Sequence, residues 1–187
     1  MSSATPASPR RSSHTVKALE IDVPLELDVQ FATRSRFVPS PHAVRRWAAA
    51  AQAAPLRMTV RIVGAPEARR LNLQHRQRDY ATNVLTYVYG NDGAVLCGDL
   101  VICAPVVARE ARQQGKPLSA HYAHLVVHGL LHLQGHDHDN ERDAQSMERR
   151  ERRIMKSLRY GDPYAMRVAG PARAARQAGT AIKNRKS

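Results

Sequence analysis

The fold and the chemistry expected of this chain both depend on residues 128–138, which read HGLLHLQGHDH. On a helix, side chains four residues apart lie on one face, so His128 and His132 can offer two imidazole nitrogens to one ion. Gly135 follows at the spacing of a left-handed helix cap, because glycine adopts a positive φ without steric cost. The chain can then turn back and bring His138 to the same ion. The segment therefore predicts a helix that ends at Gly135 and a site with three histidine ligands.

A site with three protein ligands leaves a fourth position for water, which distinguishes catalytic zinc sites from closed structural ones. We therefore predict one zinc ion on His128, His132 and His138. Other histidines keep the ligand assignment open, since His136 is the leading substitute for His138 and His124 lies one turn back on nearly the same face. The competing interpretation is a histidine-rich helix that binds no metal.

Two further residues of this segment bear on the chemistry. Asp137 is a candidate for a carboxylate that orients a ligand ring, or it is simply an acidic residue in the turn that leaves the helix. Zinc proteases with this histidine spacing carry a glutamate base directly after the first histidine, whereas this chain has Gly129. A peptidase would therefore lack its main proton acceptor. Zinc would still lower the pKa of bound water from 15.7 to about 7, so hydrolysis of another substrate is still available.

The charge of the chain indicates an anionic partner. Its 187 residues suit one globular domain with a sizeable core, and the formal charge is +13, which favours nucleic acid. Residues 1–19 contribute +3 and residues 166–187 contribute +6, with no acid in either, so residues 20–165 keep +4. We expect residues 20–165 to form the domain and the two ends to be basic disordered arms. These arms either contact phosphate or serve only as soluble ends.

The location of the protein is also suggested by its composition. Cys97 and Cys103 are its only cysteines and form no CxxC pair, which fits a reducing compartment. The chain has no stretch of about 18 apolar residues and no apolar segment typical of a signal peptide. We predict a cytoplasmic protein without membrane association.

Hydrophobic periodicity predicts strands that alternate with helices. The expected strands lie at 25–31, 56–63, 84–89 and 100–103, and the last two pair as a hairpin with a longer loop through residues 90–93. The expected helices lie at 41–54, 66–75, 105–115, 119–135 and 140–159. We expect Ser40 and Ser119 to cap the first and fourth helices. The pattern predicts an α/β (α+β) fold, a single domain with a small mixed sheet of about four strands packed with about five helices.

Three segments of the chain carry a family resemblance. They are LNLQHRQRDYATNVLTY at 71–87, GDLVICAPVV at 98–107 and HYAHLVVHGLLHLQGHDH at 121–138, with a weaker match in GDPY at 161–164. Together and in this order they resemble the YbeY family of bacterial endoribonucleases. The resemblance covers about residues 20–165 and leaves both basic ends out.

The resemblance implies a zinc ion on His128, His132 and His138 and an essential arginine at Arg76. It also implies cleavage of single-stranded RNA, maturation of the 3′ end of 16S rRNA, and a role in ribosome quality control. The implied partners are the 30S or 70S ribosome, a small-subunit ribosomal protein and an Era-type GTPase. The chain departs from the family pattern at His75, Ala81, Thr86, Tyr87 and His136.

Arg76 cannot act as a base, because guanidinium is not deprotonated in proteins, but its planar fork suits two-point contact with a phosphate. We expect it to stabilise charge on the phosphoryl oxygens while zinc binds a water or a phosphate oxygen. Without the family, the preferred interpretation is a surface ion pair, for example with Asp79. Attack by zinc-bound hydroxide and attack by the neighbouring 2′-hydroxyl are both compatible with the sequence.

Two other functions compete with the endoribonuclease. One is a metal-dependent peptidase or amidohydrolase, which Gly129 disfavours. The other is a non-catalytic ribosome-assembly factor, in which zinc is structural and the basic arms bind the ribosome.

Overall fold

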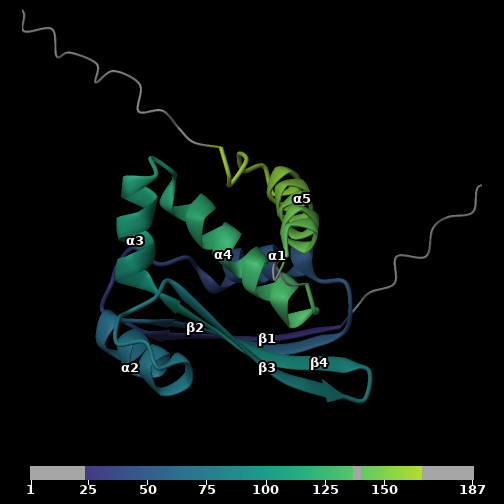
Figure 1. Cartoon of the computed structure of the whole chain (residues 1–187), viewed down its shortest axis with the longest axis horizontal. Coiled ribbons are helices and arrows are strands. Elements are labelled where there is room, and N and C mark those ends of the chain that lie inside the picture. Colours follow the sequence, from purple (N-terminus) through teal and green to yellow (C-terminus); the bar gives the residue numbers. More distant parts are fainter. Residues whose placement is uncertain (1–23, 137–139, 166–187) are drawn as a thin grey trace, which may run out of the picture.

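A mixed four-stranded sheet lies under a layer of helices (Figure 1). The computed structural model describes residues 24–136 and 140–165. The strands are β1 (Leu25–Ala32), β2 (Leu56–Val63), β3 (Val84–Asp92) and β4 (Val95–Cys103), and their order across the sheet is β1-β2-β4-β3. The first three in this order are parallel, and β3 is antiparallel to β4. The expected mixed sheet is confirmed.

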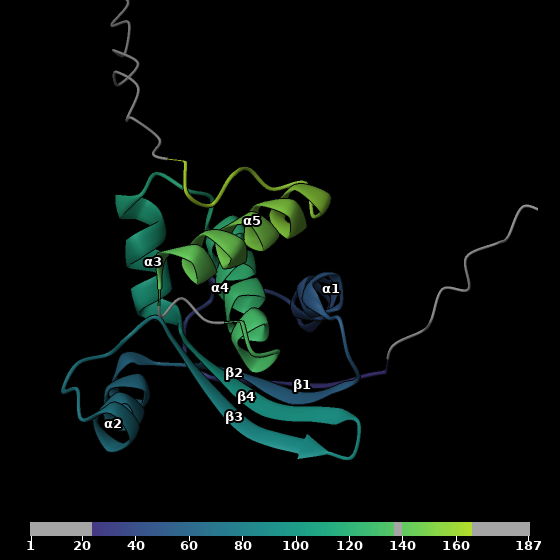
Figure 2. The ribbon, with the colours of Figure 1, turned by 45° about the vertical axis from the view of Figure 1, so that its right-hand side comes forward.

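Five helices complete the described part of the chain, as the sequence predicted. They are α1 (Pro41–Ala51), α2 (Ala65–Arg76), α3 (Ala104–Gln113), α4 (Leu118–Leu133) and α5 (Glu141–Ser157). Alternate residues of β4 face two different cores: Leu100 and Ile102 pack with α1 and α4, whereas Val101 and Cys103 pack with α2. Helix α2 therefore covers the sheet face opposite α1 and α4, and α5 lies outside α4 (Figure 2). The α/β fold class is confirmed.

Helix α4 lies at the centre of the molecule and packs against α1, α3, α5, β3 and β4. It passes very close to the sheet at Gly129, where an added Cβ would lie 2.4 Å from Leu100 Cδ2. A side chain at position 129 would therefore enter the sheet and not the neighbouring histidine face. The absence of a glutamate after His128 has a packing reason.

The C-terminus of α4 has the geometry that the sequence predicted. Gly135 has φ +80°, and its amide donates to His132 O at 3.0 Å while the next amide, of His136, donates to Leu131 O at 2.9 Å. This pair of bonds closes the helix as a Schellman motif. At the other end the expected Ser119 cap is wrong, because the helix begins at Leu118 after Pro117, whose carbonyl accepts the first helical bond.

The β3–β4 hairpin is longer than expected. Its strands pair as far as Asp92 and Val95, so Gly93 and Ala94 form the turn and the expected longer loop through residues 90–93 is wrong. A register shift between Val88 and Gly90 lets the strands continue, and Gly90 has φ +92° at this point.

Several expectations concern residues outside the described ranges. These are the two basic ends, residues 1–19 and 166–187, and the segment 137–139. Within residues 24–136 and 140–165, no helix is long and apolar enough to span a membrane.

Candidate metal centre

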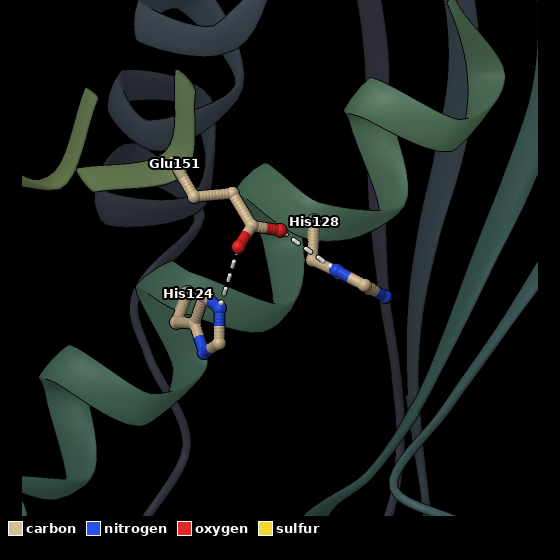
Figure 3. A group of neighbouring side chains, drawn as sticks. All are labelled: His124, His128 and Glu151. Atoms are coloured by element: carbon tan, nitrogen blue, oxygen red, sulfur yellow. Dashed lines mark hydrogen bonds and ion pairs between the residues drawn. The ribbon is translucent and has the colours of Figure 1, made fainter. Parts of the chain in front are cut away.

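The candidate site lies where α5 crosses the histidine face of α4 (Figure 3). His124, His128 and His132 follow each other at four-residue spacing, so α4 presents their rings in a row. Glu151 of α5 reaches between the first two rings. The second ring nitrogen of His128 points away from Glu151 (Figure 3).

Glu151 is fully buried, with 0% of its surface exposed. Its Oε1 lies 2.7 Å from His128 Nδ1, its Oε2 lies 3.2 Å from His124 Nε2, and the Tyr164 hydroxyl also donates to Oε2. Burial on its own would raise the pKa of this carboxyl, but the hydrogen bonds from His124, His128 and Tyr164 outweigh it and hold the pKa at about 2. Glu151 is therefore a carboxylate at neutral pH and accepts all three bonds.

The carboxylate fixes which nitrogens of the two rings carry hydrogen. Because Glu151 can only accept, His128 donates from Nδ1 and His124 donates from Nε2. The Nε2 atom of His128 then presents a lone pair, and it lies 3.2 Å from His132 Nε2. Two imidazole ligands of one tetrahedral zinc, each at about 2.0–2.1 Å, lie about 3.3 Å apart. The His128 and His132 nitrogens therefore fit a shared ion.

A second, overlapping group also has the composition of a metal site. Ligand atoms of His124, His128 and Glu151 all lie within 4.8 Å of one another. Imidazole and carboxylate together suit a divalent ion. The histidine face is thus compatible with a metal in two arrangements that share His128.

The structure treats the predicted ligands differently. It brings His128 and His132 together, while His138 and Asp137 lie outside the described residues. The alternative ligand His136 lines a hollow with Arg150 and Arg153. Burial, together with the charge of Arg150, lowers the pKa of His136. His136 therefore lies close to positive charge, and its part as a substitute ligand stays a prediction.

Arg76 is the last residue of α2, where the sequence placed it in a loop. It lies near Tyr87 of β3. Burial raises the pKa of Tyr87, and the positive charge of Arg76 only partly offsets this effect. Asp79, which the interpretation without the family resemblance paired with Arg76, instead accepts two hydrogen bonds from Arg69, at 2.6 and 2.7 Å. In the described ranges no hydrogen bond or ion pair is seen between Arg76 and the α4 histidines, and the catalytic role of Arg76 stays a prediction.

Sequence reasoning missed Glu151 and Tyr164. The signal for Glu151 was its position on the apolar face of α5, four residues from Met147 and four from Met155. The residues next to Glu151 in the sequence are mostly arginines. An acid in line with two core methionines is expected to be buried and paired. Tyr164 belongs to the GDPY segment, for which we predicted no chemical role.

Fold and site together define an α/β protein with a histidine face that is compatible with a metal ion. The family model described as endoribonuclease YbeY matches residues 40–159. Endoribonuclease YbeY of Methylibium petroleiphilum is 55% identical over 142 residues, which are 75% of this chain and 95% of the relative. The corresponding protein of Aromatoleum aromaticum is 57% identical over 127 residues, 68% of this chain and 82% of the relative. A Thermotoga maritima protein of known solution structure is 20% identical, with a TM-score of 0.47, over 74% of this chain and 99% of its own.

This chain belongs to the endoribonuclease YbeY family. The family resemblance seen in the sequence is thereby confirmed, and with it the class of enzyme, an endonuclease that acts on RNA.

Proposed function

We propose that the protein is a zinc-dependent endoribonuclease specific for single-stranded RNA, with His128, His132 and His138 as ligands and Arg76 as the phosphate-binding residue. The observation that carries the proposal is the 3.2 Å separation of His128 Nε2 and His132 Nε2, which suits two ligands of one ion. The spacing of His138 after the Gly135 turn supports the third ligand. Family membership supports RNA as the substrate.

The donor set suits zinc, which accepts imidazole nitrogens and keeps an open position in catalytic sites. When bound, zinc would supply Lewis acidity towards a water or a phosphoryl oxygen. The protein supplies the orientation: α4 presents His128 and His132 from one face, and Glu151 fixes the ring of His128. The close approach of Gly129 to the sheet fixes the height of this face above β4.

Arg76 would bind the scissile phosphate and stabilise the charge that grows on its oxygens. Its position at the end of α2 is held by two contacts between this helix and the segment that follows it: Asn72 donates to Tyr80 O, and Arg69 donates to Asp79. We further propose that the substrate is the 3′ end of 16S rRNA in the cytoplasm, and that the protein takes part in ribosome quality control. Its partners would be the 30S or 70S ribosome, a small-subunit ribosomal protein and an Era-type GTPase, as the family resemblance implies.

Cleavage of an end-labelled single-stranded RNA tests this proposal. We expect His132→Ala to lose activity and Arg76→Ala to lose about 10²–10³-fold, as is usual when one charge-stabilising donor is removed. Two matched controls should cut like wild type. His42→Ala removes an exposed histidine of α1, and Arg112→Ala removes an exposed arginine from the last turn of α3, the place that Arg76 has in α2.

If all variants cut alike after identical purification, the activity belongs to a contaminating nuclease. If His132→Ala still supports rRNA processing in cells, the enzymatic proposal is wrong and the assembly factor takes its place.

A further inference from the structure

We propose that Glu151, held by Tyr164, is a positioning residue that keeps the Nδ1–H tautomer of His128 and thereby directs His128 Nε2 at the metal. The inference deepens the proposed function and rests on it, because it assumes a metal on the His132 side of the ring. It assigns a role to two residues that belong to no predicted ligand set.

The first argument is the geometry of the carboxylate. Glu151 is buried and its two oxygens receive donors from His124, His128 and Tyr164. The 2.7 Å distance to His128 Nδ1 is that of a charge-assisted hydrogen bond and is shorter than the roughly 3.3 Å between two ligands of one tetrahedral ion. Glu151 therefore acts on His128 as an acceptor. A carboxylate in this position typically fixes the orientation of a metal-binding histidine.

The second argument is the anchoring of Tyr164. Asp162 accepts a bond from the Tyr164 amide at 2.9 Å and is itself bound by Arg152 at 3.3 Å. The Arg152 guanidinium also lies over the Tyr164 ring, 4.8 Å from its centre, and Lys116 donates to Pro163 O. The GDPY segment is thus held against α5 and against the connection between α3 and α4. These contacts hold the Tyr164 hydroxyl in place, where it donates a hydrogen bond to Glu151.

A third argument comes from a second carboxylate–histidine pair on the same helix. Glu110 of α3 lies 2.8 Å from His121 Nε2, and this ring is also buried. The other nitrogen of His121, Nδ1, is buried and has no hydrogen-bond partner within the described chain. The other nitrogen of His128 instead faces His132. Both pairs consist of a glutamate and a histidine ring. Of the two rings, only His128, the partner of Glu151, has its other nitrogen next to a second imidazole, that of His132.

Zinc affinity, measured by competition with a chromophoric chelator, tests the role of Glu151. We expect Glu151→Gln to weaken zinc binding about 10–100-fold, the usual cost of losing a group that orients a ligand. Tyr164→Phe should weaken it less, because it removes one of three donors to the carboxylate. The matched control Glu110→Gln alters the equivalent pair at His121 and should bind zinc like wild type.

A second readout requires no metal. Ring ¹⁵N shifts of the zinc-free protein should show His128 protonated at Nδ1 in wild type and a mixture of tautomers in Glu151→Gln. A merely structural role would not produce this change. If Glu151→Gln does not fold, Tyr164→Phe carries the test, and an unchanged zinc affinity in that variant overturns the inference.

Two ligand variants separate this inference from the proposed function. If His132→Ala loses zinc while Glu151→Gln binds it like wild type, the metal site stands and the positioning role is wrong. If His124→Ala loses zinc and His132→Ala does not, the metal lies among His124, His128 and Glu151, and both proposals fall.

Discussion

Gly129 shows how packing limits the chemistry that this helix can carry. Its residue type follows from the close approach of α4 to Leu100, and a larger residue would be directed into the sheet. A proton acceptor on this face must therefore come from a position other than 129. Glu151 of α5 provides a carboxylate there, but its three hydrogen bonds and low pKa of about 2 make it an acceptor for rings and not a base poised near neutral pH.

Substitution of Gly129 by alanine tests the packing argument. Alanine gains up to about 1 kcal/mol in helix propensity, but overpacking a core costs about 1–3 kcal/mol. Because the added Cβ would lie 2.4–2.8 Å from three atoms of the fully buried Leu100 side chain, we expect a net loss of about 1–2 kcal/mol in urea unfolding. Gly64→Ala is the control, since its Cβ would meet only Pro66 Cδ at 3.7 Å. Equal stability of Gly129→Ala and wild type would contradict the argument.

At the scale of elements, the segment after α2 decides where Arg76 lies. Gln77 leaves the helix in the left-handed conformation with φ +57°, and the chain then runs back to β3. The buried Asn72 amide donates to Tyr80 O at 2.8 Å, and the exposed Arg69–Asp79 pair lies further out. Buried hydrogen bonds contribute more than exposed ion pairs, so Asn72 is the stronger of the two restraints.

We expect Asn72→Ala to destabilise the protein by about 1–3 kcal/mol, the usual cost of leaving a buried polar group without its partner. It should also lower RNA cleavage by displacing Arg76, while zinc affinity stays unchanged because α2 lies on the other face of the sheet from α4. Arg69→Ala should have smaller effects on both stability and cleavage. A larger effect of Arg69→Ala than of Asn72→Ala would show that Arg69, and not Asn72, is the stronger restraint on the segment after α2.

For the whole molecule, the distribution of charge separates the domain from its ends. Residues 20–165 carry +4 of the total +13, and the remaining charge lies at 1–19 and 166–187. The domain would therefore supply the chemistry, and the ends would add affinity for phosphate that does not depend on base sequence.

Deletion of residues 166–187 tests this division. If all six cations of this segment contact phosphates of a single-stranded RNA, they contribute roughly −4 to the slope of the logarithm of the binding constant against the logarithm of the salt concentration. We expect the truncated protein to bind RNA more weakly and with a shallower salt dependence, while zinc affinity is retained. Full-length protein with these six residues changed to Gln is the control for length. An unchanged salt slope in both variants would show that this segment does not contact RNA.

The sequence determined the features that depend on local periodicity and on caps. Strands and helices alternate as expected, Ser40 accepts from the Ala43 amide, and Gly135 closes α4 with a positive φ. The four-residue spacing of His128 and His132 was sufficient to predict that their nitrogens meet. These predictions succeeded because each rests on neighbours within one or two turns of the chain.

The tertiary structure alone decided the features that join distant residues. Glu151 is 23 positions from His128, and their contact depends on how α5 crosses α4. Tyr164 reaches the same carboxylate from the end of the domain, and the pairing of Asp79 with Arg69 depends on the path of the chain after α2. Packing angles and turn paths are set by the sum of many contacts, so no local pattern specifies them. The sequence therefore predicted that His128 and His132 lie side by side, whereas the packing of two helices decided that the Glu151 carboxylate contacts His124 and His128.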